Sequence, residues 1–283
     1  MHDLVRTMAI VISSVAGAAT AASAAERRTE LIRYADVQVE VVVEGAGPAV
    51  VLLPSLARDS DDYDAVAEGL AAAGFSVLRP KPRGIGRSTG PMTGITLHDL
   101  ARDIAETVTR LSGDRAVIVG HAFGNWVARM TAADHPKLVR GVVIAAAAAK
   151  TYPAELSKAV TNAGNPALSR DERLTALRFA FFAPGHDPTP WLEGWHPDIR
   201  DSQRAAVAAV KQDEWWSGGS APLLDLQAGD DPFKPEAKRN ELKDEFGDRV
   251  TVAVIPHASH ALIPEQPKAV VNALVQWIKT LPQ

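Results

Sequence analysis

Acidic and imidazole side chains late in the chain have the types and the order of a proton-transfer pair. Asp230 and Asp231 lie in the loop-like stretch "LQAGDDPFKP", and His257 and His260 lie in "VIPHASHALIPEQP". An imidazole that is held by a carboxylate can take a proton from a hydroxyl group or from water. Taken singly, an Asp in a Pro-bounded loop is usually a turn residue, and a lone His usually makes structural hydrogen bonds. Neither residue therefore indicates acid–base chemistry by itself.

The stretch "VIVGHAFGNW", residues 117–126, has the frame of a nucleophile site without a nucleophile. A β-branched run ends at Gly120, a second glycine follows at Gly124, and Ala122 stands between them. Such a glycine pair between a strand and a helix is typical of a turn so tight that other side chains would collide there. The methyl group of Ala122 cannot attack a substrate. Covalent catalysis through residue 122 is therefore excluded.

Composition limits the remaining chemistry. The 283 residues include no cysteine, which excludes thiol catalysis, cysteine-ligated metals and a disulfide framework. The net charge of -4 combines interspersed charges of both signs, so nucleic acid is not an expected partner. We expect no metal and no cofactor. A short basic cluster at Lys81, Arg83 and Arg87 is either an anion site or, as we expect, a set of loop-capping ion pairs.

The elements that must position these residues alternate along the chain. Continuous apolar runs at 49–54 and 75–80 are typical of buried parallel strands, and the alternating run at 37–45 is typical of a half-exposed edge strand. Thr96 and Asp99 predict a capping box at the start of a helix. Further strands are predicted at 116–120, 141–148, 222–228 and 250–256, and helices at 61–75, 96–113, 125–136, 235–247 and 265–281. This alternation predicts an α/β fold with a mostly parallel, doubly wound sheet.

Residues 150–220 interrupt this rhythm. They are helical in tendency, rich in proline and large aromatic residues, and hold four of the six tryptophans. An insertion between two parts of one sheet is predicted to form a helical cap over the carboxyl edge of the strands, where open α/β folds bind ligands. We expect a core of residues 30–149 and 221–283 with a cap of residues 150–220. As a group, the cap aromatics favour a small apolar molecule as the partner.

The first 25 residues follow the plan of a secretory signal peptide. A short apolar run precedes small residues in an Ala-x-Ala arrangement at 22–24. We therefore expect an exported protein, periplasmic or secreted, with no membrane span once the signal is removed. The alternative is an N-terminal extension on a cytoplasmic protein.

In their order, these motifs resemble the α/β-hydrolase superfamily. The glycine-framed turn resembles its nucleophile elbow, Gly-x-Ser-x-Gly, in all but Ala122. The loop after the cap resembles the family's acid loop, in which the Asp-Pro-x-x-Pro pattern selects Asp231 and leaves Asp230 as the alternative. The stretch after the last strand resembles the family's histidine loop, and this match selects His260 over His257. The resemblance covers roughly residues 37–281.

The resemblance implies an oxyanion hole made by the backbone N–H groups of Leu56 and Phe123. The family commonly has His-Gly at the end of the early strand, whereas this chain has Pro54-Ser55. Ser55 is therefore also a candidate for a relocated nucleophile, although it lacks an elbow. We expect a substrate pocket whose lining is mostly aromatic, formed by Ser55, Phe182, Trp191, Trp195 and Trp215.

Three interpretations of Ala122 remain open. In the first, His260 and Asp231 activate a water molecule directly, and the protein hydrolyses a small apolar ester, lactone or amide-like substrate. In the second, the pocket binds a small ligand without turning it over. In the third, the alanine is a substitution introduced into an ordinary serine esterase. An unused buried Asp–His pair would be costly to maintain, which favours a hydrolase-type site over a pure binding protein.

Overall fold

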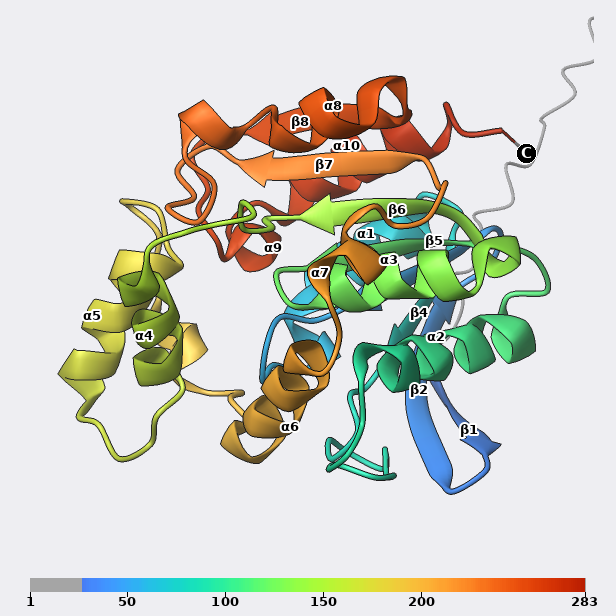
Figure 1. Cartoon of the computed structure of the whole chain (residues 1–283), viewed down its shortest axis with the longest axis horizontal. Helices are drawn as coiled ribbons and strands as arrows, with labels where there is room; N and C mark the ends of the chain where they lie inside the picture. Colours follow the sequence, from blue (N-terminus) through green and yellow to red (C-terminus); the bar gives the residue numbers. More distant parts are fainter. Residues whose placement is uncertain (1–26, 283) are drawn as a thin grey trace, which may run out of the picture.

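An eight-stranded sheet runs through residues 27–282, the part of the chain that this computed structural model describes. Its spatial order is β1-β2-β4-β3-β5-β6-β7-β8 (Figure 1). The six strands from β4 to β8 in this order run parallel, which confirms the predicted mostly parallel α/β fold. The strands are β1 (Arg28–Tyr34), β2 (Val37–Gly45), β3 (Ala49–Leu53), β4 (Ser76–Pro80), β5 (Ala116–His121), β6 (Val139–Ala145), β7 (Leu223–Ala228) and β8 (Val250–Ile255).

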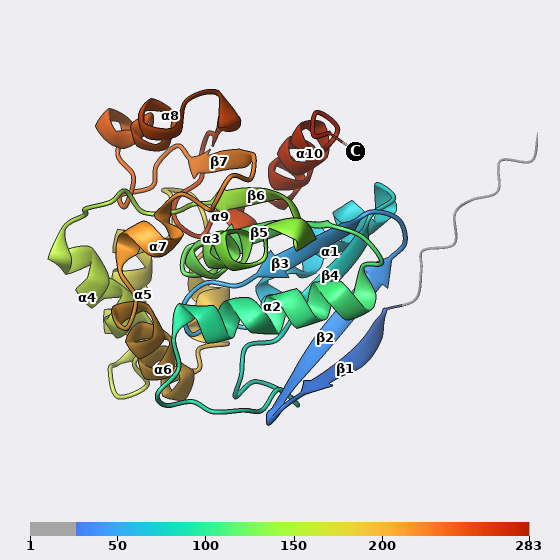
Figure 2. The same ribbon diagram turned by 45° about the vertical axis from the view of Figure 1, so that its right-hand side comes forward.

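The prediction that residues 37–45 form an edge strand was wrong. Strand β2 lies between β1 and β4 and pairs antiparallel with both, as Figure 2 shows. The true edge strand is β1, which the sequence pattern did not indicate. The alternation of apolar and polar residues identified β2 as a strand but did not give its place in the sheet. This alternation reflects which face of the strand is buried, and it is the same whether one or both edges of the strand are paired.

Helices cover both faces of the sheet, as a doubly wound fold requires. One core packs side chains of α2 and α3 against the strands, and the opposite core packs α1 and α10 against the other face. The predicted capping box is present, since the backbone N–H of Thr96 donates to the carboxylate of Asp99 at the start of α2. The helices of the two faces are α1 (Asp64–Ala72), α2 (Leu97–Leu111), α3 (Gly124–Asp134), α8 (Glu241–Phe246), α9 (Leu262–Glu265) and α10 (Pro267–Ile278).

Between β6 and β7 the chain leaves the sheet and forms α4 (Ala154–Ala163), α5 (Arg170–Ala180), α6 (Pro197–Ala208) and α7 (Gln212–Trp216). Helices α4 and α5 lie beyond the carboxyl ends of β6 and β7 in Figure 1, and α6 lies below them, under α7. Helix α7 differs from them, because its Trp215 and Trp216 belong to the core that also holds α2 and α3. The insertion therefore contributes both a cover over the strand ends and a helix packed on the core.

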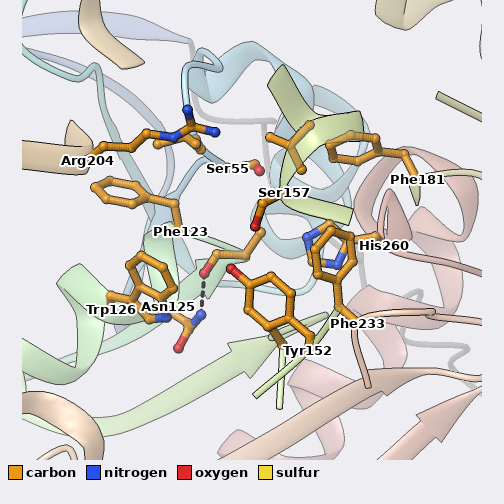
Figure 3. A pocket seen from close by; sticks show the side chains of 14 residues that line it. Ser55, Phe123, Asn125, Trp126, Tyr152, Ser157, Phe181, Arg204, Phe233 and His260 are labelled. Atoms are coloured by element: carbon orange, nitrogen blue, oxygen red, sulfur yellow. Dashed lines mark hydrogen bonds between the residues drawn. The ribbon is translucent and has the colours of Figure 1, made fainter. Parts of the chain in front are cut away.

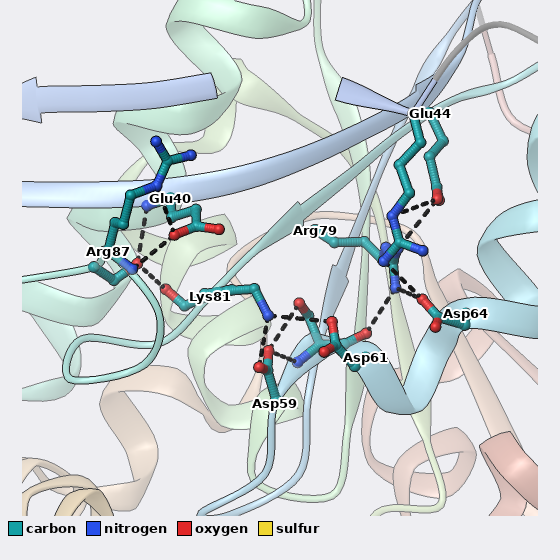
Figure 4. A network of polar contacts seen from close by, with 11 residues as sticks. Glu40, Glu44, Asp59, Asp61, Asp64, Arg79, Lys81 and Arg87 are labelled. Carbon is teal, nitrogen blue, oxygen red and sulfur yellow. Dashed lines mark hydrogen bonds and ion pairs between the residues drawn. The ribbon is translucent and has the colours of Figure 1, made fainter. Parts of the chain in front are cut away.

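Ion pairs hold the segment that follows β4, in which Lys81, Arg83 and Arg87 lie. Lys81 lies 2.6 Å from a carboxylate oxygen of Asp59, and Arg87 lies 3.2 Å from one of Glu40 (Figure 4). Arg83 makes a buried pair with Asp103 at 2.8 Å. The three basic residues that the sequence groups together are thus each paired with a carboxylate, as the loop-capping interpretation expects.

The predicted signal peptide, residues 1–25, lies outside the described residues. Within residues 27–282, no helix is both long and apolar enough to cross a bilayer.

Candidate active site

The turn between β5 and α3 places Ala122 at its tip in a strained backbone conformation. Its φ is +47°, in the left-handed region that few residues other than glycine adopt. A Cβ on Gly120 would lie 2.3 Å from the carbonyl oxygen of Gly124, and a Cβ on Gly124 would lie 2.5 Å from that of Leu53. Both positions therefore accept only glycine. The sequence folds into this turn because each crowded position lacks a side chain.

His260 and Asp231 form a buried pair beside this turn. The Nδ1 atom of His260 lies 3.0 Å from Oδ2 of Asp231, and their side chains are 6% and 1% exposed. The other carboxylate oxygen accepts a hydrogen bond from the backbone N–H of Phe233 at 2.9 Å, which fixes the carboxylate. The two alternatives, Asp230 and His257, do not take part in this pair. The hydrogen-bonded pair is thus Asp231 with His260, and its catalytic role stays a prediction.

Aromatic rings and a second histidine fix the imidazole of His260. The ring of Phe233 lies 4.1 Å from it, centroid to centroid, and that of Phe181 lies 5.5 Å away. His121 donates its Nε2–H to the backbone carbonyl of His260 at 2.6 Å. Complete burial lowers the pKa of His121 to about 3, with a smaller contribution from the nearby His260, so this donor is neutral at physiological pH. His121 therefore holds the histidine loop and does not carry charge.

This arrangement leaves one nitrogen of His260 available for chemistry. Because an ionised Asp231 can only accept, Nδ1 of His260 carries the proton between them, and Nε2 is left with its lone pair. Within residues 27–282, no protein atom forms a hydrogen bond with Nε2. The tautomer is therefore the one that can accept a proton from a reactant in the cavity.

Two backbone N–H groups are free near the turn. Those of Leu56 and Phe123 donate no hydrogen bond to any residue in the described range 27–282, and both residues line the cavity that holds Ala122. The loop that carries Leu56 is held by its neighbour Ala57, which has a φ of +58°. Ala57 donates its N–H to Oε1 of Gln203 at 2.8 Å and accepts one from the N–H of His196 at 2.9 Å. The helical insertion therefore fixes this loop.

A cavity of about 120 Å³ joins these parts. Its volume is comparable with an engineered cavity of about 150 Å³ that binds benzene, so a short acyl group or a small ring fits. Figure 3 shows Phe123 and Trp126 on one side of it and His260 and Phe233 on the other. The lining is mainly apolar and consists of Ser55, Leu56, Ala122, Phe123, Asn125, Trp126, Ala148, Tyr152, Ser157, Val160, Phe181, Arg204, Phe233 and His260.

Of the five residues expected to line the pocket, only Ser55 does so. Phe182 packs against the ring of Trp191 at 5.4 Å, and its neighbour Phe181, which follows the end of α5 at Ala180, lines the cavity in its place. Trp191 and Trp195 pack behind Phe181, with centroid distances of 5.3 and 5.8 Å.

Trp215 also lies behind the lining. It packs against the ring of Trp126 at 5.4 Å, and Trp126 is the residue that faces the cavity. The predicted aromatic character of the site is therefore present, but different residues supply it. Trp191, Trp195 and Trp215, which were expected to line the cavity, instead pack against the rings that do line it.

Sequence reasoning missed the polar residues that the insertion contributes, namely Tyr152, Ser157 and Arg204. Ser157 and Val160 are three residues apart on α4 and both face the cavity, so helical spacing would have linked them. That spacing alone does not say which face of α4 turns toward the strand ends. No three His, Asp or Glu side chains of residues 27–282 are grouped so that they would hold a metal ion.

Comparisons with known proteins agree with this geometry. The family model described as alpha/beta hydrolase fold matches residues 48–267. The soluble epoxide hydrolase of Corynebacterium sp. is 34% identical over 107 residues, which are 38% of this chain and 37% of that protein. The 2-(acetamidomethylene)succinate hydrolase of Mesorhizobium japonicum is 31% identical over 117 residues, 41% of each chain. The matches thus span less than half the length of these two relatives.

Among solved structures, the esterase from Exiguobacterium antarcticum superposes with a TM-score of 0.73 at 18% identity. The superposition covers 88% of this chain and 99% of the esterase. At this identity the likeness concerns the fold.

Proposed function

Because this chain belongs to the alpha/beta hydrolase fold family, we propose that it is a hydrolase in which His260 activates water directly. The observation that carries the proposal is the hydrogen bond between His260 and Asp231 at the wall of the cavity that Ala122 also lines. The relatives named as hydrolases support the reaction class. The proposed substrates are small esters, lactones or amide-like compounds whose acyl part is apolar, since the cavity is small and mainly apolar.

The reaction proceeds in two steps on the bound substrate. Nε2 of His260 takes a proton from water as the water oxygen attacks the carbonyl carbon, and Asp231 stabilises the imidazolium that forms. The carbonyl oxygen becomes an oxyanion that the N–H groups of Leu56 and Phe123 stabilise. The C–O bond to the leaving group then breaks, and the imidazolium returns its proton to that group. An ester thus gives an acid and an alcohol, and a lactone gives a hydroxy acid. In an amide-like substrate the bond that breaks is C–N, and the leaving amine takes the proton.

The absence of a nucleophile sets the expected rate. General base catalysis contributes about a hundredfold to ten-thousandfold, whereas removing the serine of a serine protease costs about a millionfold. The oxyanion hole and substrate binding still leave about a thousandfold over water. We therefore expect slow hydrolysis of activated substrates.

The first experiment measures hydrolysis of p-nitrophenyl acetate and of a small lactone. The unmodified chain should hydrolyse one of them above the buffer rate, and His260→Ala should lower that rate by about a hundredfold or more. His257→Asn changes an exposed histidine of the same loop and should leave the rate unchanged. Hydrolysis that persists in His260→Ala, or a rate equal to buffer with both substrates, would contradict the proposal.

The second experiment restores the missing hydroxyl. If the oxyanion donors and His260 are assembled as described, Ala122→Ser should raise the turnover number by about a hundredfold or more and should react with a fluorophosphonate probe. A restored hydroxyl that remains unlabelled would mean that the parts around it are not aligned for acyl transfer.

A second candidate function follows from the methyl group of Ala122 in a mainly apolar cavity, namely binding of a small apolar ligand without turnover. It predicts that such a ligand raises the melting temperature, and that Asp231→Asn keeps this shift. In that case the unmodified chain would show no hydrolysis with any ester or lactone.

A further inference from the structure

The cavity carries one permanent charge. Among the lining residues, all within the described part of the chain, only Arg204 is a cation at every physiological pH. The carboxylate nearest to the reacting position, Asp231, does not line the cavity and is covered by His260. A substrate therefore meets a positive charge and no negative one.

The guanidinium of Arg204 is held in place but not neutralised. Arg204 is an exposed residue, and its Nη2 donates to Oγ1 of Thr161 at 3.0 Å, which links α6 to α4. No carboxylate of residues 27–282 lies within 4.0 Å of it, and the nearby Asp201 pairs instead with Arg200 at 3.0 Å. Arginine has five N–H donors in a fixed fork, so this side chain keeps most of its donors for a ligand.

The position of Arg204 is opposite to that of the acid–base pair. In Figure 3 Arg204 appears on the same side of the view as Phe123, whereas His260 appears on the other side. The hydroxyl groups of Tyr152 and Ser157 also face the cavity in this view, and neither forms a hydrogen bond with any of residues 27–282. A ligand whose carbonyl lies at the reacting position can therefore extend toward a cation.

We propose that Arg204 binds a carboxylate at the distal end of the substrate, so that the site prefers monoesters of dicarboxylic acids over neutral esters. This inference rests on the proposed hydrolase function for its kinetic test. The apolar middle of the cavity accommodates the methylene chain, and the planar guanidinium matches a carboxylate with two parallel hydrogen bonds. The substrate is then apolar in its acyl chain and anionic at its far end.

The kinetic test compares mono-p-nitrophenyl adipate with p-nitrophenyl methyl adipate, which differ only in the free carboxylate. We expect the unmodified chain to show a KM for the charged ester about tenfold below that for the neutral one. Arg204→Gln should remove this preference, and Arg204→Lys should keep part of it because the charge remains without the fork. Raising the salt concentration should narrow the difference, since an exposed ion pair is screened.

Arg200→Gln is the matched control, because Arg200 lies on the same helix and does not line the cavity. It should leave the ratio of the two KM values unchanged. An equal KM for both esters, or a ratio that Arg204→Gln does not alter, would overturn the inference while leaving hydrolysis itself in place.

A binding measurement separates the two proposals. Adipate should raise the melting temperature of the unmodified chain and of His260→Ala, but not that of Arg204→Gln. Any shift that dimethyl adipate causes should be the same with and without Arg204. If adipate binds through Arg204 but neither ester is hydrolysed, the hydrolase function fails and the carboxylate site stands. No difference between adipate and its dimethyl ester refutes the carboxylate site.

Discussion

The buried His121 predicts a specific loss of stability in mild acid. Burial lowers the pKa of this imidazole to about 3 in the folded protein, whereas an unfolded chain restores the usual value of 6.5. Below the unfolded value, the unfolded chain therefore binds one more proton at this position than the folded protein does. The free energy of unfolding falls as the pH falls through this range.

The size of the effect follows from the two pKa values. At pH 5 the unfolded imidazole is almost fully protonated and the folded one is neutral. Because pH 5 lies about 1.5 units below the unfolded pKa, protonation stabilises the unfolded chain by about 2 kcal/mol. At pH 7.5 both are neutral and the contribution is close to zero. Other groups also titrate between these values, so only the difference between matched variants isolates His121.

His121→Gln is the variant of choice, because the Gln amide can still donate to the carbonyl of His260 but does not titrate. Urea unfolding of both proteins at pH 7.5 and pH 5 gives the four free energies. The unmodified chain should lose about 2 kcal/mol more than the variant over this interval. His98 supplies a control of opposite sign, since its hydrogen bond to Asp134 raises its pKa. His98→Gln should therefore cost more stability at pH 5 than at pH 7.5.

A loss of stability in acid that is the same with and without His121 would refute this reasoning. If His121→Gln does not fold, the imidazole itself can be followed by NMR in the unmodified chain. Its ring should remain neutral at pH 5, and a ring that protonates near pH 6.5 would show that it is not desolvated as described.

Three further predictions concern the frame of the site. Gly124→Ala would place a methyl group 2.5 Å from a backbone carbonyl oxygen and should lower the free energy of unfolding, measured by urea titration, by about 3 kcal/mol. Gly113→Ala is the control, because nothing lies within 4 Å of the added methyl group, and it should lower the free energy of unfolding by about 1 kcal/mol. Asp103→Asn leaves the buried guanidinium of Arg83 without its carboxylate and should cost about 3 to 5 kcal/mol; a change within 1 kcal/mol would mean that the pair is solvated. Gln203→Leu removes the acceptor of the Ala57 N–H, which holds the loop with the proposed oxyanion donor Leu56, and should lower kcat for p-nitrophenyl acetate with little change in KM. A rise in KM alone would assign Gln203 to substrate binding instead.

The sequence predicted those parts of the site that depend on local backbone geometry. The tight turn at Ala122 requires glycine at Gly120 and Gly124, so its frame is visible in the residue types themselves. The loops with Asp231 and His260 follow strands of one parallel sheet, and parallel strands bring their carboxyl ends to one edge. Order along the chain therefore implied proximity in space.

The lining contributed by the insertion could not be predicted in the same way. Phe181 and Phe182 are adjacent and equally apolar, and nothing in the residue types says that Phe181 is the one that lines the cavity. Arg204 lies on a helix with several charged residues, and its place in the lining depends on where α6 lies relative to α4, to which one hydrogen bond links it. The edge strand β1 was missed for a related reason, because pairing with a neighbouring strand defines it more than its own pattern does.

The loop that carries Leu56 owes its shape to the insertion. Ala57 is bonded to Gln203 and His196, and the guanidinium of Arg58 donates to the carbonyl of Glu193 at 2.6 Å. Replacing the insertion with a foreign cap would therefore remove the hydrogen-bond partners of this loop and alter the backbone around Leu56. Side-chain changes elsewhere in the existing cap would leave these hydrogen bonds in place.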